Sequence, residues 1–135
     1  MLIDEEKKKL HGIRELVKSL YECSKNKLGF KKDAKIIFIV NESNAQNPLG
    51  KTAYYDPQNY KVAVYTNGRH SKDILRSLSH ELVHHAQNCR GEFQNTGPTQ
   101  EGYAQKDEHL RKMEKEAYLK GNMIFRDFED GLKSE

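Results

Sequence analysis

Two histidines and a glutamate form a short motif in the middle of the chain, His80-Glu81-Leu82-Val83-His84. Residues four apart on a helix share one face, so the imidazoles of His80 and His84 can bind the same metal ion. Neutral imidazole is a good zinc ligand, and a histidine pair on a rigid helix fixes part of a tetrahedral site. Glu81 lies beside the pair, where it can take a proton from a zinc-bound water. The motif therefore predicts a zinc (Zn2+) site with Glu81 as the catalytic base.

A third ligand must come from another part of the chain, because a catalytic zinc site normally has three protein ligands and one open position. The sequence predicts a long helix from about residue 104 toward 129, weakened near Gly121-Asn122, with one apolar stripe. Glu114 lies inside this stripe, where an acid is costly unless it is paired or metal-bound. We expect Glu114 to be the third ligand, with Asp107 in reserve; pairing of Glu114 with lysine or arginine is the alternative. The stripe consists of Leu110, Met113, Ala117, Gly121, Ile124, Phe125 and Phe128.

The motif itself lies in a predicted helix that begins near Ser71, a suitable N-cap, and ends near Arg90-Gly91. His80 and His84 fall nearly opposite its apolar side, so they are not both expected to be buried core residues, although an ordinary solvated face would give the same pattern. His85 falls near the edge of the apolar side, which favours a hydrogen-bonded core histidine or a support for the ligands. The apolar side consists of Ile74, Leu75, Leu78, Leu82, Ala86 and Cys89.

The remaining elements must position this helix. Residues 4 to 22 show the spacing of an amphipathic helix, and 35 to 40 form a short β-branched run typical of a buried strand. Residues 52 to 55 and 60 to 66 read as further strands, with loops at 41 to 50 and 91 to 103. The order of elements predicts an α+β fold in a single domain, residues 1–135.

Composition limits the class of protein. Charged residues make up 32% of the 135 residues and the net charge is +3, which gives no strong nucleic-acid signal. No apolar run approaches the roughly 18–20 residues of a membrane span, and the first residues lack the features of a secretory signal. We therefore expect a cytoplasmic protein with no membrane partner. In that compartment Cys23 and Cys89 are expected to be free thiols in or near the core.

The histidine motif that begins at His80 and the glutamate motif that begins at Glu114 together resemble the two motifs of the gluzincin metallopeptidases. In that family HExxH on one helix is followed on another by E-x-x-A or E-x-x-S, as Glu114-Lys115-Glu116-Ala117 follows HELVHH here. The resemblance implies zinc ligation by His80, His84 and Glu114, and hydrolysis of peptide bonds with Glu81 as base. The family often has an aspartate four residues after the third ligand, and this chain has a tyrosine there.

The chain is also similar to minimal zincins, including SprT-like and phage-encoded ones, over about residues 60 to 120. This similarity implies a minimal zincin-like core with a small, mostly antiparallel sheet, an active-site helix and a C-terminal backing helix, to which the predicted N-terminal helix is added. It implies too that strand 60–66 forms the sheet edge above the cleft, where a protein or peptide substrate could add as a strand. Tyr103 and Tyr118 are both candidates for steadying the oxyanion, although ordinary packing would explain either.

Two functions remain open at this point: a zinc-dependent peptidase, and a non-catalytic zinc-stabilised adaptor or nucleic-acid-associated module. Glu81 distinguishes them, because a structural zinc site needs no carboxylate beside the metal. A proteolytic regulator tied to DNA, as the SprT-like similarity suggests, would need a partner to reach its target.

Overall fold

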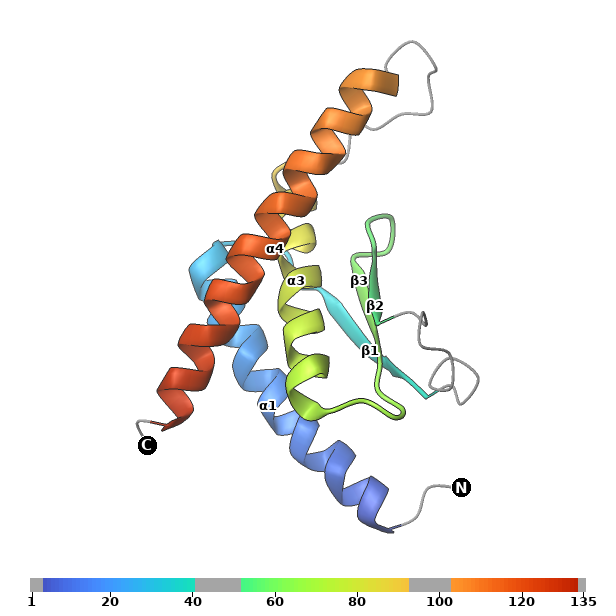
Figure 1. Ribbon diagram of the computed structural model, residues 1–135, viewed down its shortest axis with the longest axis vertical. Helices are drawn as coiled ribbons and strands as arrows, with labels where there is room; N and C mark the ends of the chain where they lie inside the picture. Colours follow the sequence, from blue (N-terminus) through green and yellow to red (C-terminus); the bar gives the residue numbers. More distant parts are fainter. Residues whose placement is uncertain (1–3, 41–51, 93–102, 134–135) are drawn as a thin grey trace.

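The computed structural model describes residues 4–40, 52–92 and 103–133 (Figure 1). In chain order they form α1 (Asp4–Leu28), β1 (Lys35–Ile39), β2 (Ala53–Asp56), β3 (Lys61–Tyr65), α3 (Ser71–Cys89) and α4 (Tyr103–Lys133). The predicted α+β class is confirmed, and each predicted helix and strand is present. The predicted loops 41–50 and 91–103 lie wholly or largely outside the described residues.

Helix α1 extends six residues beyond its predicted end at residue 22. Ile13, Val17 and Leu20 recur at helical spacing and are buried, which is why this segment packs as a helix on the core. The helix ends where Gly29 adopts a φ of +74°, a left-handed conformation that glycine enters without steric cost. The Gly29 amide donates to the Lys25 carbonyl at 2.8 Å and so caps the last turn.

The three strands form a mixed sheet in the order β1-β3-β2. β1 pairs parallel to β3, whereas β2 pairs antiparallel to it, so the prediction of a mostly antiparallel sheet is wrong. The prediction that strand 60–66 is the sheet edge is also wrong, because β3 is paired on both sides. Val62, Ala63 and Val64 are all fully buried, as expected of a central strand covered on both faces.

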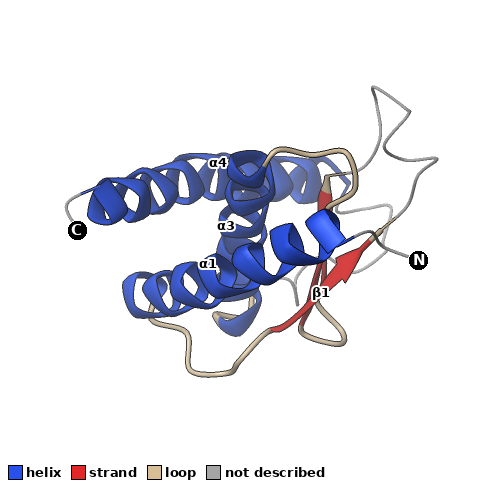
Figure 2. Cartoon of the chain, turned by 90° about the horizontal axis from the view of Figure 1, so that it is seen from below, coloured by secondary structure: helices blue, strands red, loops and turns tan. Residues whose placement is uncertain are grey.

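Helix α3 lies at the centre of the molecule, between the sheet and α4 (Figures 1 and 2). It contacts α1, α4, β2 and β3. Its N-cap is His70 and not Ser71 as predicted, because the imidazole Nδ1 of His70 accepts a hydrogen bond from the Lys72 amide and Ser71 is already helical.

Helix α4 continues through Gly121-Asn122, so the predicted weak point is absent. Gly121 instead lies where the backbone of α4 approaches that of α3. A Cβ atom at Gly121 would lie 3.0 Å from the Cα and 3.1 Å from the backbone nitrogen of His80. The buried Ser79 hydroxyl donates to the Gly121 carbonyl at 2.7 Å, which fixes the crossing by a hydrogen bond as well as by shape.

One hydrophobic core joins all these layers, with contributions from α1, the sheet, α3 and α4. Of the predicted free cysteines, Cys23 packs against this core while Cys89 is exposed at the end of α3. None of the described helices combines the length and apolar character that a bilayer crossing requires.

The crossing predicts the effect of Gly121→Ala. Backbone atoms of α3 cannot move as a flexible side chain can, so the added methyl must push the helices apart, at a cost of about 1–3 kcal/mol in the free energy of unfolding. Urea denaturation measures this loss. Gly131→Ala is the matched control, because a Cβ there meets nothing within 4 Å. It should be neutral or stabilise the helix by up to about 1 kcal/mol. Equal effects of the two substitutions would contradict the proposed role of the crossing.

Candidate metal centre

The side chains of His80, His84 and Glu114 converge, and their potential ligand atoms all lie within 4.8 Å of one another. The Nε2 atom of His84 is 2.8 Å from Glu114 Oε1, and the Nε2 atom of His80 is 3.3 Å from Glu114 Oε2. Zinc bonds of about 2.0–2.1 Å at tetrahedral angles place two ligand atoms about 3.3 Å apart. The group is therefore of the size and chemistry that can hold a metal ion.

The two histidines reach this point from one face of α3, with ring centroids 5.0 Å apart. His84 is only 7% exposed, whereas His80 is partly exposed, so the two are not both buried, as predicted. α4 packs across α3 here. This contact between distant segments could not be predicted from the helical spacing of α3 alone. His80, one turn earlier, remains partly open to solvent.

Glu114 comes from α4, seven residues before Gly121 and hence near the same side of that helix. Its side chain is 63% exposed, so it lies at the edge of the apolar stripe and not within it as predicted. His109 lies on the same helix, five residues before Glu114. Its Nε2 atom is 2.8 Å from the Glu92 carbonyl oxygen and is engaged there. The side chain of Asp107, the reserve ligand, lies outside the described residues.

Glu81 lies beside the cluster in a poorly solvated position. Burial, reinforced by the nearby Glu114 carboxylate and opposed by His84, raises the pKa of Glu81 to about 7. Burial and the neighbouring His84 lower the pKa of His80 below its ordinary value, against the effect of Glu114. Near neutral pH, His80 is thus biased toward the neutral imidazole that binds metals, and Glu81 can exchange a proton.

A cavity of about 250 Å³ opens next to His80 and Glu81. Thr52, immediately before β2, and Tyr118, one turn after Glu114 on α4, both line it. This places Tyr118 at the site, whereas the side chain of Tyr103 lies outside the described residues. It also identifies β2 as the edge strand beside the cavity. The full lining consists of Thr52, Arg76, Ser77, His80, Glu81, Tyr118 and Asn122.

His85 is a core histidine, in agreement with the first of its two predicted roles. It is fully buried, with its Nε2 atom 2.6 Å from the Lys32 carbonyl and its Nδ1 atom 2.7 Å from the Tyr55 hydroxyl. A carbonyl can only accept, so Nε2 carries the hydrogen and Nδ1 accepts from Tyr55. Both nitrogens of His85 are therefore satisfied. Asn88 donates to the same Tyr55 oxygen at 2.9 Å.

Gln87 was not among the residues predicted from sequence, yet it contacts His84 directly. Its amide oxygen lies 2.8 Å from the Nδ1 atom of His84, and the side chain is fully buried. A polar residue three positions after a ligand histidine is the signal in the sequence. Its partners on α4 could not be identified without the packing of the helices.

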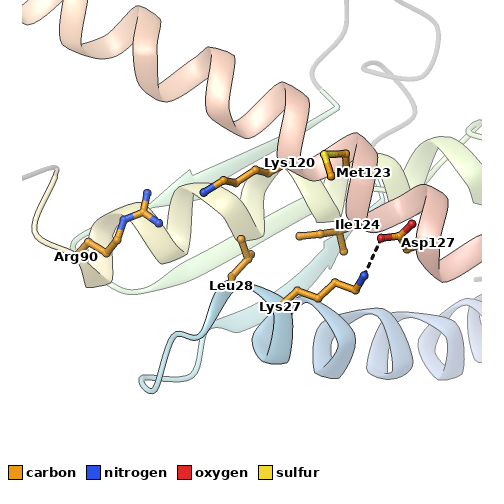
Figure 3. Close-up of a pocket in the computed structure, with 7 residues that line it drawn as sticks. All are labelled: Lys27, Leu28, Arg90, Lys120, Met123, Ile124 and Asp127. Atoms are coloured by element: carbon orange, nitrogen blue, oxygen red, sulfur yellow. Dashed lines mark hydrogen bonds and ion pairs between the residues drawn. The ribbon is translucent and has the colours of Figure 1, made fainter.

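A second pocket, of about 220 Å³, lies between α1, the end of α3 and α4 (Figure 3). Its cationic groups are engaged: Lys27 pairs with Asp127 at 2.7 Å, and Arg90 and Lys120 both bind Glu116. Burial acts to raise the pKa of Glu116, but hydrogen bonds from Lys120, Gln87 and Arg90 outweigh it and lower the pKa to about 2. This pocket therefore contributes ion pairs that join the helices.

The chain matches no protein-family model, no curated protein and no solved structure. The gluzincin resemblance therefore rests on the two motifs. A functional assignment depends on the chemistry of the side chains described above.

The pKa of Glu81 predicts a stabilising substitution in the metal-free protein. Folded protein keeps the Glu81 proton to higher pH than the unfolded chain, so this group costs stability as pH rises from its ordinary pKa of 4.5 toward 7. Glu81→Gln cannot ionise. With chelator present, it should be more stable than the wild type by about 2–3 kcal/mol at pH 8 and equally stable near pH 4.

Chemical denaturation at the two pH values measures this difference. Glu108→Gln, which neutralises an exposed carboxyl on α4, controls for the change in net charge. A Glu81→Gln variant with the same advantage at both pH values would show that the carboxyl is not destabilised by ionisation.

Proposed function

We propose that this protein is a zinc-dependent peptidase of the gluzincin type, with His80, His84 and Glu114 as metal ligands and Glu81 as general base. The observation that supports it best is the convergence of these three side chains beside a buried carboxyl at the wall of a cavity. A minimal zincin core built on α3, α4 and the β2 edge is part of the same proposal.

The set of donors favours zinc. Two imidazoles and one carboxylate match the three protein ligands of catalytic zinc sites, in which the fourth position stays open for water or substrate. A structural site is usually closed by four protein ligands, and among the described residues the cluster contains three. The exposed side of Glu114 and the adjoining cavity leave room for a substrate.

Glu81 would act on the water molecule that attacks the peptide bond. Zinc, when bound, supplies a Lewis acid that lowers the pKa of a coordinating water toward about 7. Glu81 takes one proton from this water as its oxygen adds to the peptide carbonyl carbon. It then delivers that proton to the leaving amine nitrogen as the C–N bond breaks, so the carboxylate is regenerated. A pKa close to the working pH suits a group that must both accept and donate.

The β2 edge offers a place for the substrate backbone. Among the described strands, β2 pairs with β3 on one side and with no strand on the other, and the residue before β2 lines the cavity next to His80. An extended peptide added along the other side of β2 would use main-chain hydrogen bonds and run past the metal ligands. Tyr118 also lines this cavity and would be the described tyrosine that contacts the reacting carbonyl.

The zinc content of the purified protein tests the proposed ligands. Purified wild-type protein should bind close to one zinc per chain, and His84→Ala and Glu114→Ala should each lower the affinity by more than the roughly 10–100-fold that loss of an outer hydrogen-bond partner costs. Chelator competition with metal analysis measures this. Glu108→Ala removes an exposed acid from the same helix as Glu114 and should leave the affinity unchanged. Wild-type protein that takes up no added zinc would refute the proposal at its base.

Substitution of Glu81 distinguishes a catalytic from a structural role of zinc. Glu81→Gln should bind zinc with the wild-type stoichiometry but hydrolyse a quenched fluorescent peptide library about 10²–10⁴-fold more slowly, because a general base contributes a factor of this size. Unchanged hydrolysis would eliminate Glu81 as the base. If both proteins bind zinc and neither cleaves the library, the adaptor alternative gains support, and binding to DNA or RNA at low salt becomes its test.

A further inference from the structure

Gln87 is a fully buried polar side chain on α3, one turn beyond His84. Buried amides are retained where their hydrogen bonds are made, because an unmet donor or acceptor in the core costs about 1–3 kcal/mol. Among the described residues, the side-chain amide of Gln87 hydrogen-bonds to two groups: the imidazole of His84 and the segment of α4 that carries Glu114.

The contacts fix which way the Gln87 amide faces. Its nitrogen donates to the Met113 carbonyl at 2.9 Å and to Glu116 Oε1 at 2.8 Å. The Met113 carbonyl has no hydrogen to give, and Glu116 is an ion-pair partner of two cations, Arg90 at 2.6 Å and Lys120 at 2.9 Å. A flipped amide would direct its oxygen at two acceptors. The oxygen of Gln87 must therefore face His84.

The orientation of the amide in turn fixes the tautomer of His84. The Gln87 oxygen only accepts, so the Nδ1 atom of His84, 2.8 Å away, must carry the hydrogen. A neutral ring with its hydrogen on Nδ1 has its lone pair on Nε2. That is the atom 2.8 Å from Glu114 Oε1, where the three donors converge. A lone pair and a carboxylate oxygen this close need a cation between them, which is the metal ion in a loaded site and otherwise a proton.

We infer that Gln87 is the positioning residue of the site: it holds the hydrogen of the neutral His84 ring on Nδ1, so that the lone pair of Nε2 can bind the metal. Met113 and Glu116 bracket Glu114 in sequence, so the same amide also ties the ligand-bearing turn of α4 to α3. The cations that hold Glu116 lie at the end of α3 and on α4, beside the pocket in Figure 3. This role rests on the proposed metal site, but the tautomer can be measured without metal.

The test is nitrogen-15 NMR of the histidine rings in metal-free protein, at a pH that leaves the imidazoles neutral. Wild-type His84 should keep its hydrogen on Nδ1, and Glu114→Ala, in which Nε2 has no carboxylate partner, should show a single Nδ1–H tautomer. Gln87→Met, which removes the acceptor at similar size, should show a mixture or the Nε2–H form, and should bind zinc about 10–100-fold more weakly in chelator competition. Gln87→Glu retains an acceptor for Nδ1–H but turns its second oxygen toward two acceptors, so it should keep the hydrogen on Nδ1 while lowering stability.

Asn88→Ala is the matched control, because Asn88 also donates two hydrogen bonds from α3, to Tyr55 and the Pro57 carbonyl, and touches none of the three ligands. It should lower stability while leaving the zinc affinity of the folded protein unchanged. A wild-type His84 in the Nε2–H form would overturn the inference, as would a Gln87→Met variant with wild-type tautomer and affinity. Wild-type protein with the Nδ1–H tautomer but no zinc uptake would uphold the role of Gln87 and refute the metal site alone.

Discussion

The close approach of α3 and α4 at Gly121 sets the geometry on which the candidate site depends. The backbone of α4 lies against the backbone of His80, so close that a Cβ at position 121 would lie 3.0 Å from the His80 Cα, and the Ser79 hydroxyl bonds across the crossing. Glu114 stands two helical turns from this point. A small change in the separation or angle of the two helices would therefore move its carboxylate relative to the histidines. The contact is short in space and spans 42 positions of sequence.

The same packing creates an electrostatic cost in the absence of metal. Glu81 is poorly solvated, and Glu114 on α4 places a second carboxyl near it. Bringing a second carboxylate close to a poorly solvated one destabilises a fold unless a charge of opposite sign is present. A divalent cation would supply that charge and reverse the effect on the pKa of Glu81. Metal binding would then raise the free energy of unfolding, which would couple the stability of the protein to its proposed activity.

Sequence periodicity was enough to predict the elements, but not their partners. Helical spacing predicted most of the buried faces of α1, α3 and α4, although Cys89 and Leu110, predicted on the apolar faces of α3 and α4, are exposed. The spacing of His80 and His84 predicted that their rings lie together. It could not show that β3 is the central strand, because the β-branched run of an edge and of a central strand can look alike. The burial of His84, the exposure of Glu114 and the helix running through Gly121 all depend on contacts between α3 and α4. Gln87 was missed for the same reason: its role is defined by acceptors on another helix.

The neighbouring histidines of α3 show how such contacts decide chemistry. His84 and His85 have the same side chain and adjacent positions, and both are buried. His85 directs its Nε2–H to the Lys32 carbonyl and accepts from Tyr55, so both ring nitrogens are used in holding the sheet and the chain after α1 to α3. His84 directs its Nδ1–H to Gln87, which leaves Nε2 pointing at Glu114. The two rings thus have opposite tautomers, and that difference, set by one carbonyl and one amide, makes one histidine a structural residue and the other a metal ligand in the proposed site.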